Sequence, residues 1–197
     1  MSFETCLPVI LAAEGGFIND PHDPGGATNL GVTQRTLSSW LGRPATLAEI
    51  RALAPATVAP IYRARYYEPS YAGDCPPGVE LMVFDEAVNQ GVGRAIQSLR
   101  TALGVSADGC FGPVLRTALA AANAAALVKR IAAEREAHYR SLPTFDRFGS
   151  GWLARLARTT ELALSSTPAD GELSPARAVE GEPPRAPSTP RRAERAG

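Results

Sequence analysis

The chain has 197 residues, 45% of them hydrophobic, and its 20 basic and 20 acidic side chains give a formal net charge of zero. A nucleic-acid-binding protein usually carries a basic surplus, so this balance argues against nucleic acid as a partner and against a helical DNA-binding protein. No apolar run approaches the ~20 residues that a membrane span needs. We therefore expect a monomer with one ordinary core and no stable membrane insertion.

The first residues, Met-Ser-Phe-Glu-Thr-Cys, lack a basic stretch followed by a long apolar segment, so no ordinary secretory signal is predicted. The protein is then expected to be made in the cytoplasm, where thiols stay reduced. The cysteines at positions 6, 75 and 110 are odd in number and widely spaced, and neither His22 nor His138 completes a zinc set. We predict free thiols, no metal site and no cofactor.

An amphipathic helix is predicted at the N-terminus, where Phe3, Leu7, Ile10, Leu11 and Glu14 share one face at spacings of three and four. The Glu14 carboxylate would lie near the negative end of the helix dipole and against apolar surface. Both effects disfavour its charged form, which suits a general acid that works near neutral pH. The plainer interpretation is that Glu14 is the last turn of a helix that ends at two glycines.

Turn-forming residues crowd the next segment, in which positions 19–26 hold two Pro, two Gly, two Asp and a His. A short extended piece is predicted over 28–33. A helix end with one carboxylate, followed by a hairpin with a second carboxylate and a threonine, suits glycoside hydrolysis. One acid protonates the leaving oxygen, and the other activates water or stabilises an oxocarbenium-like transition state. Turn capping is an equally good interpretation of Asp20 and Asp23.

The rest of the chain is predicted to form helices with short breaks between them, so the fold class is mainly α with a small β-hairpin at the active site. A capping box, Thr46 to Glu49, opens one short helix. Pro60 is expected in the first turn of another, where proline is tolerated. The predicted helices cover about 34–41, the segment from 46, 57–67, 78–90, 93–103, 113–121, 124–141 and 151–163.

Four of the five tyrosines fall within ten positions, at 62, 66, 67 and 71. Aromatic rings stack on sugar faces, so a glycan groove fits this cluster, and packing against the core fits it equally well. Asp85 and Asn89 lie one helical turn apart among apolar neighbours. Buried polar side chains need partners, so these two residues either hold the wall of a cleft together or contact the glycan directly.

Three blocks of sequence together resemble the glycoside hydrolase 108 family. The run Glu-Gly-Gly-Phe-x-Asn-Asp-Pro-x-Asp-Pro-Gly-Gly-x-Thr-x-x-Gly-Val, at 14–32, resembles the family's opening motif. The segment 83–113, which contains Asp85, Asn89 and Asp-Gly-x-Phe-Gly-Pro at its end, resembles its C-terminal peptidoglycan-binding region. The segment 135–152 resembles its closing helices. The resemblance runs from about residue 4 to 163.

The resemblance implies an N-acetylmuramidase with a lysozyme-like helical fold, of the kind found among phage endolysins and secretion-activator muramidases. It implies Glu14 as the catalytic acid. Phage-type lysozymes, to which the family has been likened, place Asp after eight intervening residues and Thr after five more. Asp23 has that spacing, whereas Thr28 follows it after four. Asp20 remains the alternative second carboxylate.

The resemblance also implies the substrate and the organisation of the chain. The substrate would be the β-1,4 bond between N-acetylmuramic acid and N-acetylglucosamine, and Tyr66 and Tyr67 would lie in the cleft with Asp20, Asp85 and Asn89. Residues 1–75 would be catalytic, and 76–164 would form a helical peptidoglycan-binding region packed on them. A holin or a secretion system would bring the enzyme to the periplasmic wall. The alternative is a non-catalytic wall-binding or secretion-helper protein that uses the same cleft.

The last part of the chain, 165–197, is rich in Pro, Arg and Ala and has few large apolar side chains. Such a segment cannot bury enough surface to offset the entropy lost on ordering. We predict a disordered tail.

Overall fold

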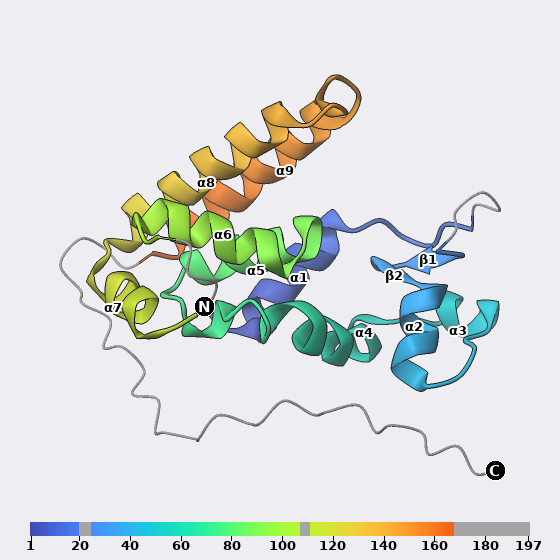
Figure 1. The fold of residues 1–197 in the computed structure, drawn as a ribbon. Coiled ribbons are helices and arrows are strands. Elements are labelled where there is room, and N and C mark those ends of the chain that lie inside the picture. The colour runs from blue at the N-terminus through green and yellow to red at the C-terminus, as the bar shows by residue number, and fades with distance from the viewer. Residues whose placement is uncertain (20–24, 107–110, 168–197) are drawn as a thin grey trace, which may run out of the picture.

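The computed structural model describes residues 1–19, 25–106 and 111–167 of the chain. The described part is mainly helical and contains one small antiparallel hairpin, as predicted (Figure 1). The elements in chain order are α1 (Phe3–Ala13), β1 (Thr28–Asn29), β2 (Val32–Thr33), α2 (Gln34–Leu41), α3 (Leu47–Arg51), α4 (Pro55–Tyr62), the π-helical η1 (Arg63–Tyr67), the 3₁₀ turn η2 (Ala72–Asp74), α5 (Val79–Gln90), α6 (Val92–Leu103), α7 (Pro113–Ala121), α8 (Ala124–Ser141) and α9 (Phe145–Ser165).

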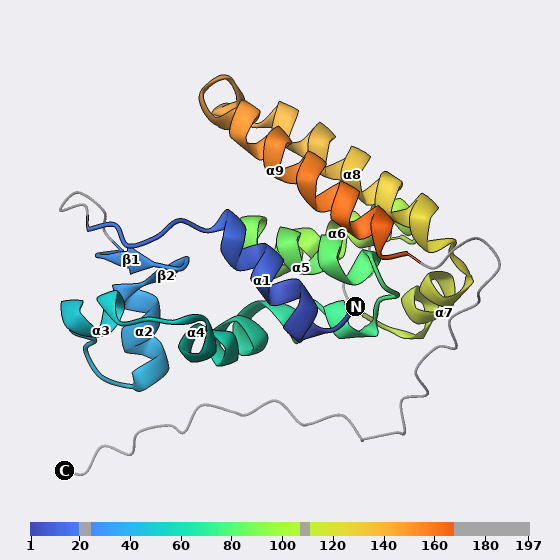
Figure 2. The ribbon, with the colours of Figure 1, turned by 180° about the vertical axis from the view of Figure 1, so that it is seen from behind.

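Helix α5 lies at the centre of the molecule. Every residue from Val79 to Ala87 is buried, as expected for a helix surrounded by protein rather than one at the surface. Around it pack α1, α6, α8, α9 and the η1 turn, and the two views show α1 and α6 beside it (Figures 1 and 2). The core around α5 therefore draws on both the first and the last helices of the chain.

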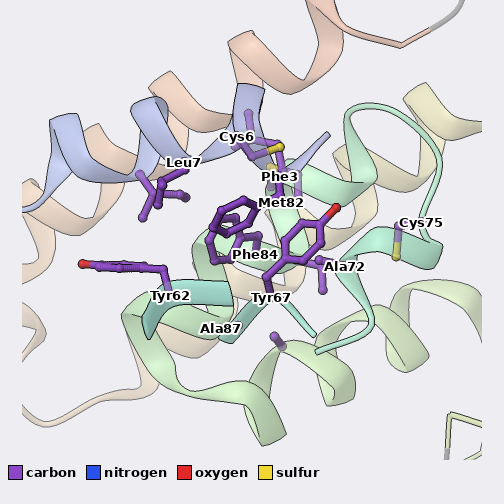
Figure 3. Packing of buried hydrophobic residues seen from close by; sticks show 14 of the residues in the cluster. Phe3, Cys6, Leu7, Tyr62, Tyr67, Ala72, Cys75, Met82, Phe84 and Ala87 are labelled. Atoms are coloured by element: carbon purple, nitrogen blue, oxygen red, sulfur yellow. The ribbon is translucent and has the colours of Figure 1, made fainter. Parts of the chain in front are cut away.

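Three aromatic rings fix α1 against this centre. Phe3 of α1 packs edge-on against Tyr67 of η1 at a centroid distance of 5.1 Å, and Tyr67 packs against Phe84 of α5 at 5.2 Å. Figure 3 shows the three side chains together inside the cluster of buried residues. Offset and edge-to-face ring pairs of this kind add about 0.5–1.5 kcal/mol each beyond the area they bury. They orient α1, and with it the residue that follows its last turn.

The hairpin β1–β2 forms a small lobe with α2 and α3 at one side of the helical body (Figure 1). Its two turn residues, Leu30 and Gly31, both have positive φ angles, 48° and 71°, which is the geometry of a tight two-residue hairpin. The Asn29 amide donates to the carbonyl oxygens of Ile50 at 3.0 Å and Arg51 at 3.3 Å. These bonds attach the hairpin to the end of α3.

Most predicted helix bounds are confirmed, but the helix predicted over 57–67 differs. It begins at Pro55, and Thr57 completes its N-terminal cap by accepting a hydrogen bond from the Ala54 amide at 2.8 Å. Pro60 therefore lies inside α4, so its placement in the first turn was wrong. Beyond Tyr62 the chain continues as a π turn, which is one residue wider than an α turn.

Helix α9 also begins earlier than predicted, at Phe145 instead of 151. Gly149 lies in the part of the helix that was not predicted; it is buried, and a Cβ on it would overlap the Phe145 ring. The glycine serves close packing inside a continuous helix. Helices α8 and α9 run side by side and extend beyond the body as a two-helix arm (Figures 1 and 2).

Two of the cysteines lie in the described part of the chain. Cys6 and Cys75 are free and buried, and burial raises the pKa of the Cys6 thiol to about 12. The tail was predicted to begin at 165, but Ser165 is the last residue of α9, so that start was wrong. Cys110 and the tail from 168 lie outside the described residues, so the prediction that this part is disordered stays a prediction. Within the described ranges, no helix combines the length and the apolar character that crossing a membrane requires.

Candidate functional site

Glu14 lies where the sequence placed it, at the end of the first helix, as the residue directly after Ala13. Its backbone has already left the helix, with φ −88° and ψ 136°, and its amide donates to the Leu11 carbonyl at 3.2 Å. The side chain is 20% exposed. Glu14 is thus a carboxylate at the junction between the helical body and the hairpin lobe, open to solvent on one side.

A guanidinium group from the far end of the chain contacts this carboxylate. Arg155 of α9 donates from Nη1 to Oε1 of Glu14 at 2.8 Å. The apolar surface expected beside Glu14 is therefore replaced, on this side, by a cation. Burial opposes the charge on Arg155, but the carboxylates of Asp85 and Glu14 more than offset that effect and raise the pKa of Arg155.

Asp85 holds the opposite edge of the same guanidinium. Its Oδ1 accepts from Arg155 Nε at 3.0 Å. Arg155 Nη2 lies 2.9 Å from the same oxygen, in ion-pair contact without the angles of a hydrogen bond. The other oxygen of Asp85, Oδ2, accepts from Nη2 of Arg135 at 2.7 Å. Four charges of alternating sign therefore run from Glu14 through Arg155 and Asp85 to Arg135.

Asn89 lies at the far end of this polar network. The hydroxyl of Tyr139 accepts from Arg135 at 3.1 Å and donates to Oδ1 of Asn89 at 2.9 Å. Asp85 is 1% exposed, and both of its oxygens are occupied. Of the two roles considered for Asp85 and Asn89, these contacts favour holding the site together over touching a glycan.

The hairpin turn forms the other side of the Glu14 environment. A Cβ atom built on Gly31 would lie 2.9 Å from Oε2 of Glu14, and closer still to the hydroxyl oxygen of Tyr62. That hydroxyl donates to the carbonyl of Leu30 at 2.9 Å. Burial, and then the negative charge of Glu14, raise the pKa of Tyr62. Only a glycine lets the turn approach Glu14 this closely.

The predicted aromatic pair is divided between two environments. Tyr66 is half-buried, and its ring lies 5.6 Å from that of Tyr62, which places it near the Glu14 side of the molecule. Tyr67 points into the core, where its hydroxyl donates to the buried carboxylate of Glu80 at 2.5 Å. Of the tyrosine cluster, Tyr62 lies beside Glu14, although the resemblance favoured Tyr66 and Tyr67, and the structure does not bring Tyr67 to the site.

The remaining predicted site residues belong to the hairpin and the segment before it. Thr28 is half-buried in β1, and its hydroxyl lies 3.5 Å from the Gly26 carbonyl oxygen to which it donates. Asp20 and Asp23 lie outside the described residues. Arg155 gave only a weak signal in the sequence. It shares the face of its helix that also carries Trp152 and Thr159, which is unusual for a solvated arginine.

An apolar groove of about 850 Å³ lies between α1 and α4. Its walls include Leu7, Leu11 and Pro60, but not Glu14. Its charged lining residues, Glu4 and Arg63, pair with each other, so the groove is not the candidate site.

Comparison with known proteins finds relatives of the chain in both sequence and structure. Residues 7–91 match the family model described as Glycosyl hydrolase 108. Among solved structures, the chain is similar to SagA of Brucella abortus, with 36% identity and a TM-score of 0.72 over 83% of this chain and 94% of that one. A search of curated proteins finds no match. The structural likeness confirms the predicted mainly α, lysozyme-like fold with its small hairpin.

Proposed function

Because the chain belongs to the glycosyl hydrolase 108 family, and is therefore a glycoside hydrolase as the motif at 14–32 predicted, we propose that it is an N-acetylmuramidase. Its substrate would be the β-1,4 bond between N-acetylmuramic acid and N-acetylglucosamine in peptidoglycan. One observation carries the proposal. Glu14 is a partly exposed carboxylate at the junction of helix and hairpin, with one oxygen bonded and the other facing the hairpin turn.

Glu14 acts as the general acid in this proposal. Arg155 occupies Oε1, and Oε2 accepts no hydrogen bond from the described part of the chain, so Oε2 is the oxygen that can carry the proton. The proton passes from Oε2 to the glycosidic oxygen as the bond to the anomeric carbon breaks. Asp23, or Asp20 in its place, offsets the positive charge on the sugar or activates the attacking water.

The glycan strand would lie along the junction between the helical body and the hairpin lobe. Tyr66 is the aromatic residue best placed to stack on a sugar, since it is partly exposed and packs on Tyr62 beside Glu14. Helices of the 76–164 region would add contacts to peptidoglycan. A holin or a secretion system would supply the route to the periplasmic wall.

Glu14→Gln tests the assignment of the acid. The amide has nearly the shape of the carboxylic acid but cannot donate a proton as an acid does, so the rate should fall at least ~100-fold. Release of reducing sugar from purified peptidoglycan measures the rate, and thermal melting verifies the fold. Glu161→Gln, a change at an exposed carboxylate on α9, is the matched control and should keep full activity. More than about a tenth of wild-type activity in Glu14→Gln would exclude Glu14 as the general acid.

The same assay, applied to alanine variants of Asp23 and Asp20, identifies the second carboxylate. The true partner, Asp23 or Asp20, should lose orders of magnitude in rate when changed to alanine, and the other should show only the small stability loss of a weakened turn. The competing function, a non-catalytic wall-binding or secretion-helper protein, predicts a different result. Wild-type protein would then bind sacculi and release no reducing sugar.

A further inference from the structure

The partner of Glu14 is supplied from outside the part of the chain that matches the family model. Arg155 is 141 positions from Glu14, and the matched segment ends at residue 91. Helix α9, whose middle carries Arg155, packs on both α5 and α8. A group from the last helix is therefore in direct contact with the proposed acid.

The position of Glu14 needs such a restraint. It is the first residue beyond α1 and has an extended backbone, so the helix does not constrain its side chain. A glutamate side chain has three rotatable bonds, and a partly exposed one samples several rotamers. The hydrogen bond to Oε1 on one side and the Gly31 turn against Oε2 on the other leave little room for rotation.

Arg155 is itself held in place. Asp85 engages its Nε and Nη2 edge, which leaves Nη1 directed at Glu14. Asp85 in turn pairs with Arg135, which is completely buried on α8. Because the charges alternate in sign, none of the four lacks an opposite neighbour, which is the condition under which buried charges are tolerated.

The contact between Arg155 and Glu14 is compatible with both protonation states of the acid. In the neutral acid, the carbonyl oxygen Oε1 accepts from Arg155 while Oε2 keeps the proton. After the proton has passed to the leaving oxygen, Glu14 is a carboxylate, and the guanidinium lies 2.8 Å from the new negative charge. A cation already in position there stabilises charge that develops during the reaction.

On the basis of the proposed hydrolase function, we propose that Arg155 is a positioning residue for Glu14. It fixes which oxygen of Glu14 carries the proton and stabilises the carboxylate that the reaction leaves behind. Asp85 orients Arg155 for this role. The reacting centre thus requires α9 and α5 as well as α1 and the hairpin.

Replacement of Arg155 by Met and by Lys tests the proposal. Arg155→Met removes the charge and the donor, and kcat should fall roughly 100-fold, as for loss of one preorganised donor at a reacting centre. KM should stay within about threefold, because the guanidinium acts on Glu14 and not on the sugar. Arg155→Lys keeps the charge but cannot bridge two carboxylates, so its kcat should lie between those of Met and wild type.

Asp85→Asn and Arg158→Met complete the set. Asp85→Asn keeps the shape of the side chain but weakens its hold on Arg155, so kcat should fall while KM changes little. Arg158 is exposed one turn further along α9, and Arg158→Met is the matched control that should retain wild-type kcat. Each kcat is expressed per folded molecule, from melting curves recorded under the assay conditions. If Arg155→Met does not fold, the proposal is tested by Arg155→Lys and by Asp85→Asn, each measured as a single variant.

Two outcomes would overturn the proposal. Wild-type kcat per folded molecule in the Arg155 variants would show that the ion pairs serve stability alone. A rise in KM with unchanged kcat would show that Arg155 binds the substrate instead. Either result leaves the hydrolase proposal intact. Full activity in Glu14→Gln would instead contradict the proposed role of Glu14, on which the role of Arg155 depends.

Discussion

Gly31 is the residue that lets the hairpin turn lie against Glu14. Its φ of 71° belongs to the left-handed region, and a side chain there would meet both Glu14 and Tyr62. Gly42 has nearly the same backbone angle, with φ 69°, but nothing lies within 4 Å of a Cβ built on it. Alanine substitutions at the two glycines therefore share the backbone strain, but only the one at position 31 also meets the Glu14 and Tyr62 side chains.

Gly31→Ala should impair catalysis far more than stability. Both Gly31→Ala and Gly42→Ala incur left-handed strain of about 1–2 kcal/mol, which lowers Tm by a few degrees. Only Gly31→Ala also displaces Glu14 and the Tyr62 hydroxyl beside it, and a shift of this kind can cost roughly 100-fold in rate. Reducing-sugar release per folded molecule and melting temperature provide the two readouts. Equal kcat in the two variants would mean that the turn does not set the position of Glu14.

At the residue scale, the sequence indicated Glu14, the proposed acid, but not the residue that pairs with it. Glu14 could be placed because the helix end, the two glycines and the turn-rich segment are all local signals. Arg155 could not, because it is distant in sequence and its pairing depends on how α9 packs on α5. Tyr67 was placed in the cleft by the family resemblance, because a run of tyrosines does not itself reveal which rings face inward. In the structure Tyr67 is the buried residue of the π turn.

At the element scale, α5 carries three acidic residues that are buried together with its apolar ones, namely Glu80, Asp85 and Glu86. Glu80 accepts from Tyr67, and Asp85 pairs with two arginines. Glu86 is less well compensated. Its Oε1 accepts from Ser98 at 2.7 Å, but among the described residues its buried Oε2 has no hydrogen-bond donor. Burial raises the pKa of Glu86 to about 6.

This shift predicts a pH-dependent effect of Glu86→Gln. An acid whose pKa is higher in the folded state destabilises the protein as pH rises above its unfolded pKa, and the full penalty is reached above its folded pKa. The penalty is absent below the unfolded value of 4.5, grows between 4.5 and 6, and reaches about 2 kcal/mol above 6. Glutamine can still accept from Ser98 and carries no charge. The variant should therefore be the more stable protein at pH 7.5 and should match wild type at pH 4.5.

Denaturant unfolding at the two pH values measures the difference in free energy. Glu161→Gln again serves as the exposed control and should show no such pH dependence. A loss of stability in Glu86→Gln that is the same at both pH values would contradict the prediction. It would mean that attraction to Arg94 and Arg135 keeps Glu86 charged throughout.

Helix bounds could be predicted wherever a local signal marks them. The capping box from Thr46 to Glu49 and the proline at the start of α7 placed two helix starts correctly. Prediction failed where packing overrides propensity. Gly149 lies inside α9 because the Phe145 ring needs the space, and Pro60 lies inside α4 although proline removes a helical hydrogen bond.

At the scale of the whole molecule, the core is continuous across residue 75, the proposed boundary between the catalytic and binding regions. Phe3 and Tyr67 pack against Phe84, and the contacts from Arg155 join Glu14 to Asp85 across the same boundary. Neither region buries its own apolar surface alone. The proposed peptidoglycan-binding helices are thus also structural support for the proposed acid.

Two truncations should separate the part of the chain that the fold needs from the part that it does not. The segment 168–197 has Leu173 and Val179 as its only large apolar side chains, so a chain that ends at Thr167 should keep its Tm and its activity on soluble glycan fragments. A chain that ends at Ser141 lacks α9. It would expose the core face on which Leu156 and Ala163 pack, and it would leave Glu14 without Arg155.

We expect this shorter chain to unfold at a much lower temperature and to be inactive, because it loses buried contacts and the partner of the acid together. Melting curves and reducing-sugar assays on both chains make the comparison. A clear fall in Tm on removal of 168–197 would show that the tail contributes to the fold. Unchanged Tm with weaker binding to whole sacculi would instead assign the tail an anchoring role. Activity in the chain that ends at Ser141 would contradict the requirement for α9.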